Sequence, residues 1–206
     1  MMTDTKQRIL QEALKLFSQS GYKGTSMNDI ASQLNVTKAA LYKHYKSKQE
    51  ILDSIVEKMN ALDRERAREY DMPEGTCEED VVEYRHIAVA KIKQFTKVQF
   101  LHWTEDEFCC QFRKMLTLEQ YRDPEMAQLY QTYLAEGPLS YMEEIFAGIV
   151  NDKKKARQSA LDFYGPIFLL YSIYDGAEDK KQVVKMVEQH VEEFAKRIEL
   201  RGTDKC

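Results

Sequence analysis

The chain has 206 residues, enough to bury a real core in one or two domains, and its 12 Tyr and 9 Phe exclude a disordered protein. The formal net charge of −4 is unfavourable for a nucleic-acid partner, but the charge is unevenly distributed along the chain. Residues 1–60 carry nine Lys/Arg against six Asp/Glu, whereas the remainder carries 21 against 28. Residues 1–60 are therefore basic and the remainder is acidic, so attraction for phosphate is concentrated in the N-terminal part of the chain.

The sequence shows no targeting or membrane segment. Its first residues lack the apolar core of a signal peptide, and no apolar run approaches the roughly 20 residues of a membrane helix. Cys77, Cys109, Cys110 and Cys206 show no zinc-type spacing, and adjacent Cys109 and Cys110 would bridge only under strain. We therefore expect a cytoplasmic chain with reduced thiols and no membrane partner.

Apolar residues recur at helical spacing along the whole chain, and alternating runs typical of strands are absent. The first helix is predicted at about 5–20, with Ile9, Ala13 and Phe17 on one face and Gly21 at its end. The pattern continues to about nine or ten helices. It predicts an all-α fold.

Residues 25–52 have the pattern of a helix-turn-helix followed by the start of a further helix. Ser26 can cap the first helix with Asp29 three residues later, and Thr37 can cap the second. Asn35 suits a left-handed turn position between them. Ser47 opens the next helix, with Glu50 completing a capping box. The sequence therefore predicts two short helices crossing at a tight turn.

Polar and basic side chains gather where this motif would meet DNA. Lys38 and Ala39 lie at the start of the second helix, which normally enters the major groove. Lys38 can reach guanine acceptors, and Ala39 offers a methyl contact. The expected DNA-binding set also includes Thr37, Tyr42, Lys43, His44 and Lys48. The alternative is a solvated basic face, which is the usual meaning of scattered lysines.

The motif resembles the DNA-binding domain of the TetR/AcrR family of bacterial transcriptional regulators. The positions in the family's register are Gly21, Thr25, Ile30, Ala31, Val36–Lys38, Leu41, Tyr42, His44, Tyr45, Ser47, Lys48, Ile51 and Leu52. The chain departs from the family at Asn35 and Ala39, where glycine is frequent, and at Gln49, where glutamate is. The resemblance implies a DNA-binding domain at 1–50 and a ligand-binding and dimerisation domain at 51–206. It adds Thr25, Ser26 and Met27 to the DNA contacts, and matches Tyr42, His44 and Lys48 to backbone-contacting positions.

The middle of the chain carries further start and stop signals. Residues 71–75 interrupt the helical pattern, and Thr76–Glu79 can cap a long helix reaching about 100. Another helix is predicted at about 105–118, before an N-cap and proline pattern at Asp123-Pro124. Pro138 and Pro166 each follow a glycine, and each predicts a kink or break.

The last helix, predicted at about 179–200, has an a/d stripe typical of shallow helix packing. Its members are Val184, Val187, Val191, Phe194 and Ile198. The preceding helix is apolar all round over 166–171, so more than one of its sides must be covered. Such stripes are often intrachain core, but the family resemblance implies that the last two helices form a homodimer interface, and we assign the stripe to it.

Aromatic residues in the middle helices can line an apolar cavity or simply form core. The resemblance implies an effector cavity there, for which we select Trp103, Phe112, Tyr130, Tyr133 and Phe168. Because the remainder of the chain is acidic, we expect an apolar effector that is neutral or cationic.

Metal and catalytic interpretations have little support. The spacing of His86, His102, Cys109 and Cys110 fits no standard ligand pattern, and phosphate-loop, HExxH and nucleophile-elbow motifs are absent. We therefore expect no metal, no cofactor and no enzymatic activity. The hypothesis is a ligand-responsive repressor that binds a palindromic double-stranded operator, with a helical enzyme or an interaction module as the alternatives.

Overall fold

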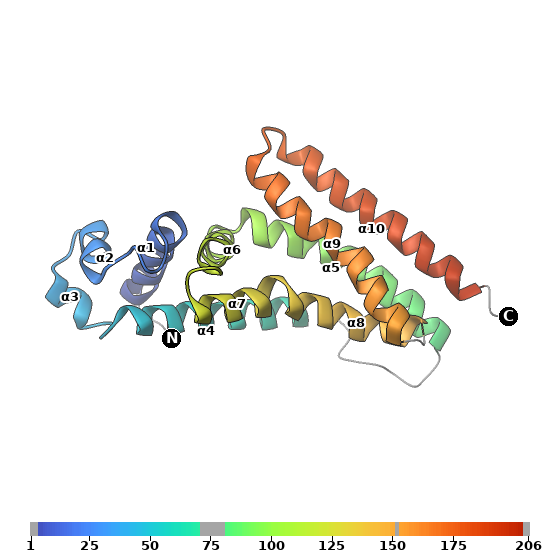
Figure 1. Ribbon diagram of the computed structural model, residues 1–206, viewed down its shortest axis with the longest axis horizontal. Helices are drawn as coiled ribbons and strands as arrows, with labels where there is room; N and C mark the ends of the chain where they lie inside the picture. The colour runs from blue at the N-terminus through green and yellow to red at the C-terminus, as the bar shows by residue number, and fades with distance from the viewer. Residues whose placement is uncertain (1–3, 71–80, 151–152, 204–206) are drawn as a thin grey trace. The chain divides into compact units, whose positions relative to one another are not determined.

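The computed structural model describes residues 4–70, 81–150 and 153–203, and their regular structure is entirely helical, which confirms the all-α prediction (Figure 1). The helices are α1 (Asp4–Ser20), α2 (Met27–Gln33), α3 (Lys38–Tyr42), α4 (Lys48–Glu69), α5 (Val81–Glu105), α6 (Glu107–Glu119), α7 (Pro124–Leu134), α8 (Glu136–Val150), α9 (Lys153–Gly176) and α10 (Lys180–Thr203). The cap predicted at 76–79 and two of the cysteines, Cys77 and Cys206, lie outside the described residues.

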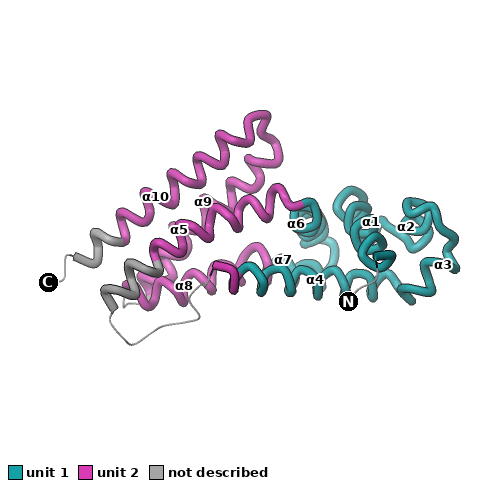
Figure 2. Tube along the Cα trace, turned by 180° about the vertical axis from the view of Figure 1, so that it is seen from behind, with its two compact units in different colours: residues 1–66, 107–130 teal, residues 67–106, 131–206 magenta. Residues whose placement is uncertain are grey.

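The chain divides into two compact units, coloured separately in Figure 2. Unit 1 contains residues 1–66 and 107–130, and unit 2 contains residues 67–106 and 131–206. The compact unit that holds the helix-turn-helix thus reaches beyond residue 50, where the sequence placed the domain boundary. It includes most of α4, all of α6 and the first part of α7.

Unit 1 is built around α1, which packs against α2 and α6. The inward face of α1 buries Ile9, Leu10, Ala13 and Phe17, all at most 3% exposed. Their three- and four-residue spacing places them on one side of a 3.6-residue helix. A helix from the middle of the chain, α6, therefore completes the core of the N-terminal unit.

Unit 2 is a helical bundle in which α8 pairs with α9, while α10 packs on α5 and α9. Rings from α8, α9 and α10 form its aromatic core: the Phe194 centroid lies 5.3 Å from that of Phe146 and 4.9 Å from that of Phe163. Lys93 of α5 forms an ion pair with Glu192 of α10 at 2.5 Å on the half-exposed rim. Such rim pairs add little stability, so the buried rings and aliphatic side chains stabilise this unit.

The stripe predicted on the last helix is part of this core. Val187, Val191, Phe194 and Ile198 are 1–7% exposed in the single chain, and Val184 is half-buried. Four of the five residues predicted at the dimer interface are therefore core residues of the single chain. The helical spacing correctly indicated packing against other helices, but those helices belong to the same chain.

The prolines take different positions in the helices. The Asp123 carboxylate accepts the backbone N–H groups of Glu125 and Met126 at 3.0 and 3.3 Å, so Pro124 begins α7 as predicted. Pro138 lies in the first turn of α8. Backbone N–H groups there have no partner within the helix, so the proline removes no helical hydrogen bond. By contrast, α9 continues through Pro166, so the chain does not break there.

Among the described residues, no helix combines the length and the apolar composition that crossing a bilayer requires.

Candidate nucleic-acid interface

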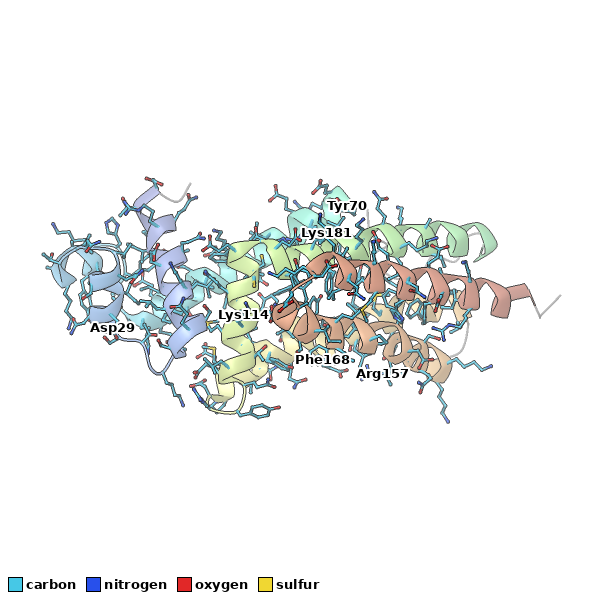
Figure 3. All side chains as sticks on the ribbon, turned by 90° about the horizontal axis from the view of Figure 1, so that it is seen from above. Asp29, Tyr70, Lys114, Arg157, Phe168 and Lys181 are labelled. Carbon is cyan, nitrogen blue, oxygen red and sulfur yellow. The ribbon has the colours of Figure 1, made fainter. Side chains whose placement is uncertain are left out.

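The first helix of the motif begins with the predicted capping box. The Ser26 hydroxyl accepts the backbone N–H of Asp29 at 3.2 Å, and the Asp29 carboxylate accepts the backbone N–H of Ser26 at 2.7 Å. The Ser26 hydroxyl also donates to that carboxylate at 2.7 Å. Hydrogen bonds from the side chain and backbone of Ser26 hold the pKa of Asp29 below its usual value. Asp29 (labelled in Figure 3) thus fixes the start of α2 by local bonds.

The turn and the second helix also follow the prediction. Asn35 has a φ of +56°, the left-handed conformation that asparagine tolerates better than most residues. Thr37 then caps α3, its hydroxyl accepting the backbone N–H of Ala40 at 3.2 Å. These two residues reverse the chain and restart a helix within a few residues.

Buried side chains hold both short helices in unit 1. Ile30 and Ala31 of α2 are 0% and 4% exposed, and Leu41 of α3 and Tyr45 beyond it are 1% and 2% exposed. A five-residue helix has little stability of its own, so this burial keeps α3 in place.

The opposite side of α3 faces solvent. Lys38, Ala39, Tyr42 and Lys43 are all exposed, and the Lys38 ammonium lies 5.8 Å from the centre of the Tyr42 ring. His44 is half-buried beside a cavity of about 110 Å³ between α1 and α3. The structure therefore brings four of the predicted contact residues together as an exposed surface with two positive charges.

Residues at the start of α2 divide between surface and core. Ser26 is exposed and Met27 is half-buried, whereas Thr25 is 3% exposed. The Thr25 hydroxyl donates to the backbone carbonyl of Gly21 at 2.9 Å. In this structure Thr25 stabilises the turn before α2, and only Ser26 and Met27 present side chains that DNA could reach.

Lys48 points into unit 1 rather than toward solvent. Its ammonium donates to the backbone carbonyls of Tyr22 and Thr25 at 2.5 and 2.8 Å, and lies 4.3 Å from the centre of the Tyr22 ring. The neighbouring cap is only half of the predicted box: Ser47 accepts the Glu50 backbone N–H at 3.1 Å, but the Glu50 carboxylate accepts from Lys46. A sequence motif alone could not show that Lys48 is held by carbonyl groups.

The residues chosen for an effector site have different surroundings. In unit 2, Trp103 and Tyr133 are 4% and 9% exposed, with ring centroids 6.4 Å apart. In unit 1, Phe112 is fully buried and Tyr130 is half-buried. Phe168 is 39% exposed on α9, which contradicts its assignment to a buried cavity. Its helical position was indistinguishable from a core position because α9 is apolar on several sides.

Comparison with known proteins matches residues 9–55 to the family described as bacterial regulatory proteins, tetR family. YuxN of Bacillus subtilis, an uncharacterised HTH-type transcriptional regulator, is 29% identical over 173 residues, which cover 84% of this chain and 47% of YuxN. The biofilm operon icaADBC negative transcriptional regulator IcaR of Staphylococcus epidermidis is 46% identical over 52 residues, or 25% of this chain and 28% of IcaR. The chain thus spans about half of the first of these relatives and less of the second.

Solved structures show the same architecture. A complex of SmeT with triclosan superposes with a TM-score of 0.64, at 18% identity, over 94% of this chain and 90% of the other. The motif and the curated relatives that it matches are those of helix-turn-helix transcriptional regulators. Residues 9–55 thus match the tetR-family model, and the chain shares the fold of solved TetR-family regulators.

Proposed function

We propose that the protein is a repressor that binds a near-palindromic DNA operator as a homodimer and leaves it when a small molecule binds. The observation that carries this proposal is the solvent-facing side of α3, where Lys38 and Lys43 flank Tyr42 while Leu41 anchors the helix. The matched IcaR domain belongs to a negative regulator, which supports repression. An operator on chromosomal DNA implies a cytoplasmic site of action.

The exposed side chains of α3 suit different parts of a DNA duplex. Lys38 lies in the first turn, which normally enters the major groove, and its ammonium can donate to guanine O6 and N7. The side chain of Ala39 is a methyl group, so it can make only an apolar contact there. Tyr42 is the last residue of α3 and Lys43 is its C-cap, and their hydroxyl and ammonium groups suit phosphate oxygens. Lys38 should therefore contribute to sequence preference, and Lys43 to affinity for any sequence.

Two lysine variants test this assignment by fluorescence anisotropy on the operator and on single-base variants of it. Lys43→Ala should weaken binding to all sequences similarly and reduce the slope of log K against log salt by about 0.9. Lys38→Ala should also reduce discrimination at one base pair, by a factor corresponding to about 1–3 kcal/mol. Lys185→Ala, in the exposed part of α10, is the matched control. Wild-type affinity and slope in both α3 variants would contradict the site.

A second copy of the chain is the proposed partner of the exposed α9 face, which comprises Leu161, Gly165, Phe168, Leu169 and Ile173. Its four large side chains are 39–59% exposed, and a Cβ added at Gly165 would meet no atom within 4 Å (Phe168 is labelled in Figure 3). Contiguous apolar faces of this kind mark interaction sites. A two-fold operator needs two copies of α3 in one assembly, which favours a homodimer.

The proposed effector is a small apolar molecule, neutral or cationic, bound in unit 2 near Trp103 and Tyr133. These rings are already packed together, and aromatic side chains are common in ligand sites of helical proteins. The excess of acidic residues after residue 60 disfavours an anion. SmeT, which has the same fold, has been captured with triclosan, so the fold can hold a small molecule.

A further inference from the structure

The last residue of α6, Glu119, has a carboxyl group buried in unit 1. The residue is 0% exposed, and neither carboxyl oxygen has a hydrogen-bond partner among the described residues. The guanidinium group of Arg122 lies 3.5 Å from the Oε1 atom of Glu119, but the Arg122 side chain is 58% exposed. A buried carboxyl group without hydrogen bonds is unfavourable for folding, so its position calls for another explanation.

Glu119 lies directly against the turn that precedes α2. Gly21 has a φ of +83°, and a Cβ added to it would lie 2.2 Å from the Glu119 Oε1 atom. The left-handed backbone favours glycine here, and a larger residue would also require the Glu119 carboxyl group to shift. The Glu119 side chain, at the end of α6, therefore covers the backbone that follows α1.

The same turn is tied to the segment after α6 by a second link. The Lys23 ammonium donates to the backbone carbonyl of Arg122 at 2.6 Å and lies 3.3 Å from the Asp123 carboxylate. Together with the Glu119–Gly21 contact, this fixes residues 21–23 at two points. The end of α6 thus holds the turn that leads into the helix-turn-helix.

Lys48 holds the turn from the first residue of α4. Its bonds to the carbonyls of Tyr22 and Thr25 bracket the residues just before the Ser26 cap. Burial lowers the pKa of Lys48, while the charge of Glu119, and then that of Asp29, act in the opposite direction. Glu119 and Lys48 thus lie against the same turn, and a carboxylate at Glu119 favours the ammonium form of Lys48.

We propose that Glu119 is a positioning residue for DNA binding: with Lys48, it fixes the turn at 21–25 and thereby the orientation of α2 and α3. Lys48 acts through this turn and does not contact a phosphate, which replaces its assignment from the sequence. The inference rests on the proposed DNA-binding function. Preorganised supporting groups of this kind keep a binding surface in its productive geometry without touching the ligand.

Three variants test the inference on the full chain: Glu119→Gln, Lys48→Met and the double variant. Operator binding is measured by anisotropy at several salt concentrations. Each single change should weaken specific binding about 5- to 20-fold and leave the salt slope unchanged, because no phosphate contact is lost. The double variant should bind no more weakly than the weaker single variant, since both act through one turn. Glu107→Gln, an exposed change in the first turn of α6, should bind as wild type.

Several results would overturn the inference. A salt slope reduced by about 0.9 in Lys48→Met would show that Lys48 neutralises a phosphate. Wild-type operator affinity in Glu119→Gln would show that its carboxyl group does not position the motif. If Glu119→Gln does not fold, the salt slope of operator binding by Lys48→Met still tests the inference.

Hydrogen exchange separates this inference from the proposed function, because it needs no DNA. Glu119→Gln should exchange faster at the backbone N–H of Thr25, which donates to the Tyr22 carbonyl at 3.3 Å, while amides in the middle of α9 stay protected. Unchanged protection at Thr25 would refute the positioning role. Faster exchange at Thr25 in a protein without operator preference would instead refute the function and leave the structural link standing.

Discussion

Tyr22 shows how one residue in the turn of unit 1 responds to its surroundings. Its ring packs edge-on against Phe17 with centroids 5.1 Å apart, and its hydroxyl donates to the Gln49 side chain at 2.8 Å. Burial, and then nearby carboxylates, raise the pKa of this tyrosine to about 12; the carboxylates belong to Glu125, Asp53 and Asp123. The folded protein therefore favours the neutral phenol more strongly than the unfolded chain does.

This shift predicts a loss of stability in alkaline solution. Because the folded pKa lies above the ordinary value of 10.0, the stabilisation is complete below pH 10 and is lost as the pH rises toward about 12. Tyr22→Phe removes the ionisable group, so its free energy of unfolding should fall less between pH 9 and pH 12. Denaturant titrations measure this, with Tyr121→Phe, at a residue 89% exposed, as the control. Equal alkaline losses in Tyr22→Phe and wild type would contradict the shift.

The local features of the DNA-binding motif could be predicted from sequence because each rests on nearby residues. Ser26 bonds to a residue three positions away, Asn35 adopts its own backbone conformation, and Thr37 caps the helix that it begins. The role of Glu119 could not be predicted in this way. Its contact with Gly21 joins residues far apart in the chain, and depends on α6 packing against α1.

At the scale of elements, α9 and α10 show what helical periodicity can and cannot determine. The a/d spacing of α10 correctly indicated a packed stripe, but α5 and α9 of the same chain cover it. The all-round apolar run in α9 was the better signal of an additional partner, since one side remains exposed. Periodicity identifies a buried face but does not say whether the same chain or another copy covers it.

Substitutions on these two faces should therefore have different consequences. Leu169→Glu, at a residue 59% exposed, should convert a dimer to a monomer with unchanged helical content. Val191→Glu, at a residue 4% exposed, places a charge in the core of unit 2 and should destabilise the fold by several kcal/mol. Light scattering after gel filtration and circular dichroism measure the two effects. An unchanged dimer in Leu169→Glu would exclude the α9 face as the interface.

At the scale of the whole molecule, the proposed function requires DNA binding and effector binding to influence each other. An effector that lowers operator affinity must bind more weakly when the operator is present, and by the same factor. We expect a coupling of about 1–3 kcal/mol, or roughly 5- to 150-fold. Titration of Trp103 fluorescence with hydrophobic amines, neutral aromatics and fatty acids, with and without operator, measures it. Tight binding of fatty acids alone would contradict the predicted effector class.

The uneven distribution of charge along the chain favours DNA binding through its N-terminal part. The excess of positive charge lies within residues 1–60, which include the exposed face of α3, and the excess of negative charge lies in the remainder. Attraction to phosphate should therefore favour approach by the helix-turn-helix, and should weaken as salt increases.

The most direct measurement of the central claim is footprinting on the DNA upstream of the gene, combined with the mass of the complex. We predict that two copies of the chain protect a near-palindromic site with half-sites separated by about one helical turn or a multiple of it. Binding should exceed that to scrambled DNA of the same length by about a thousandfold or more. Equal affinity for both DNAs, with no protected site, would contradict the account.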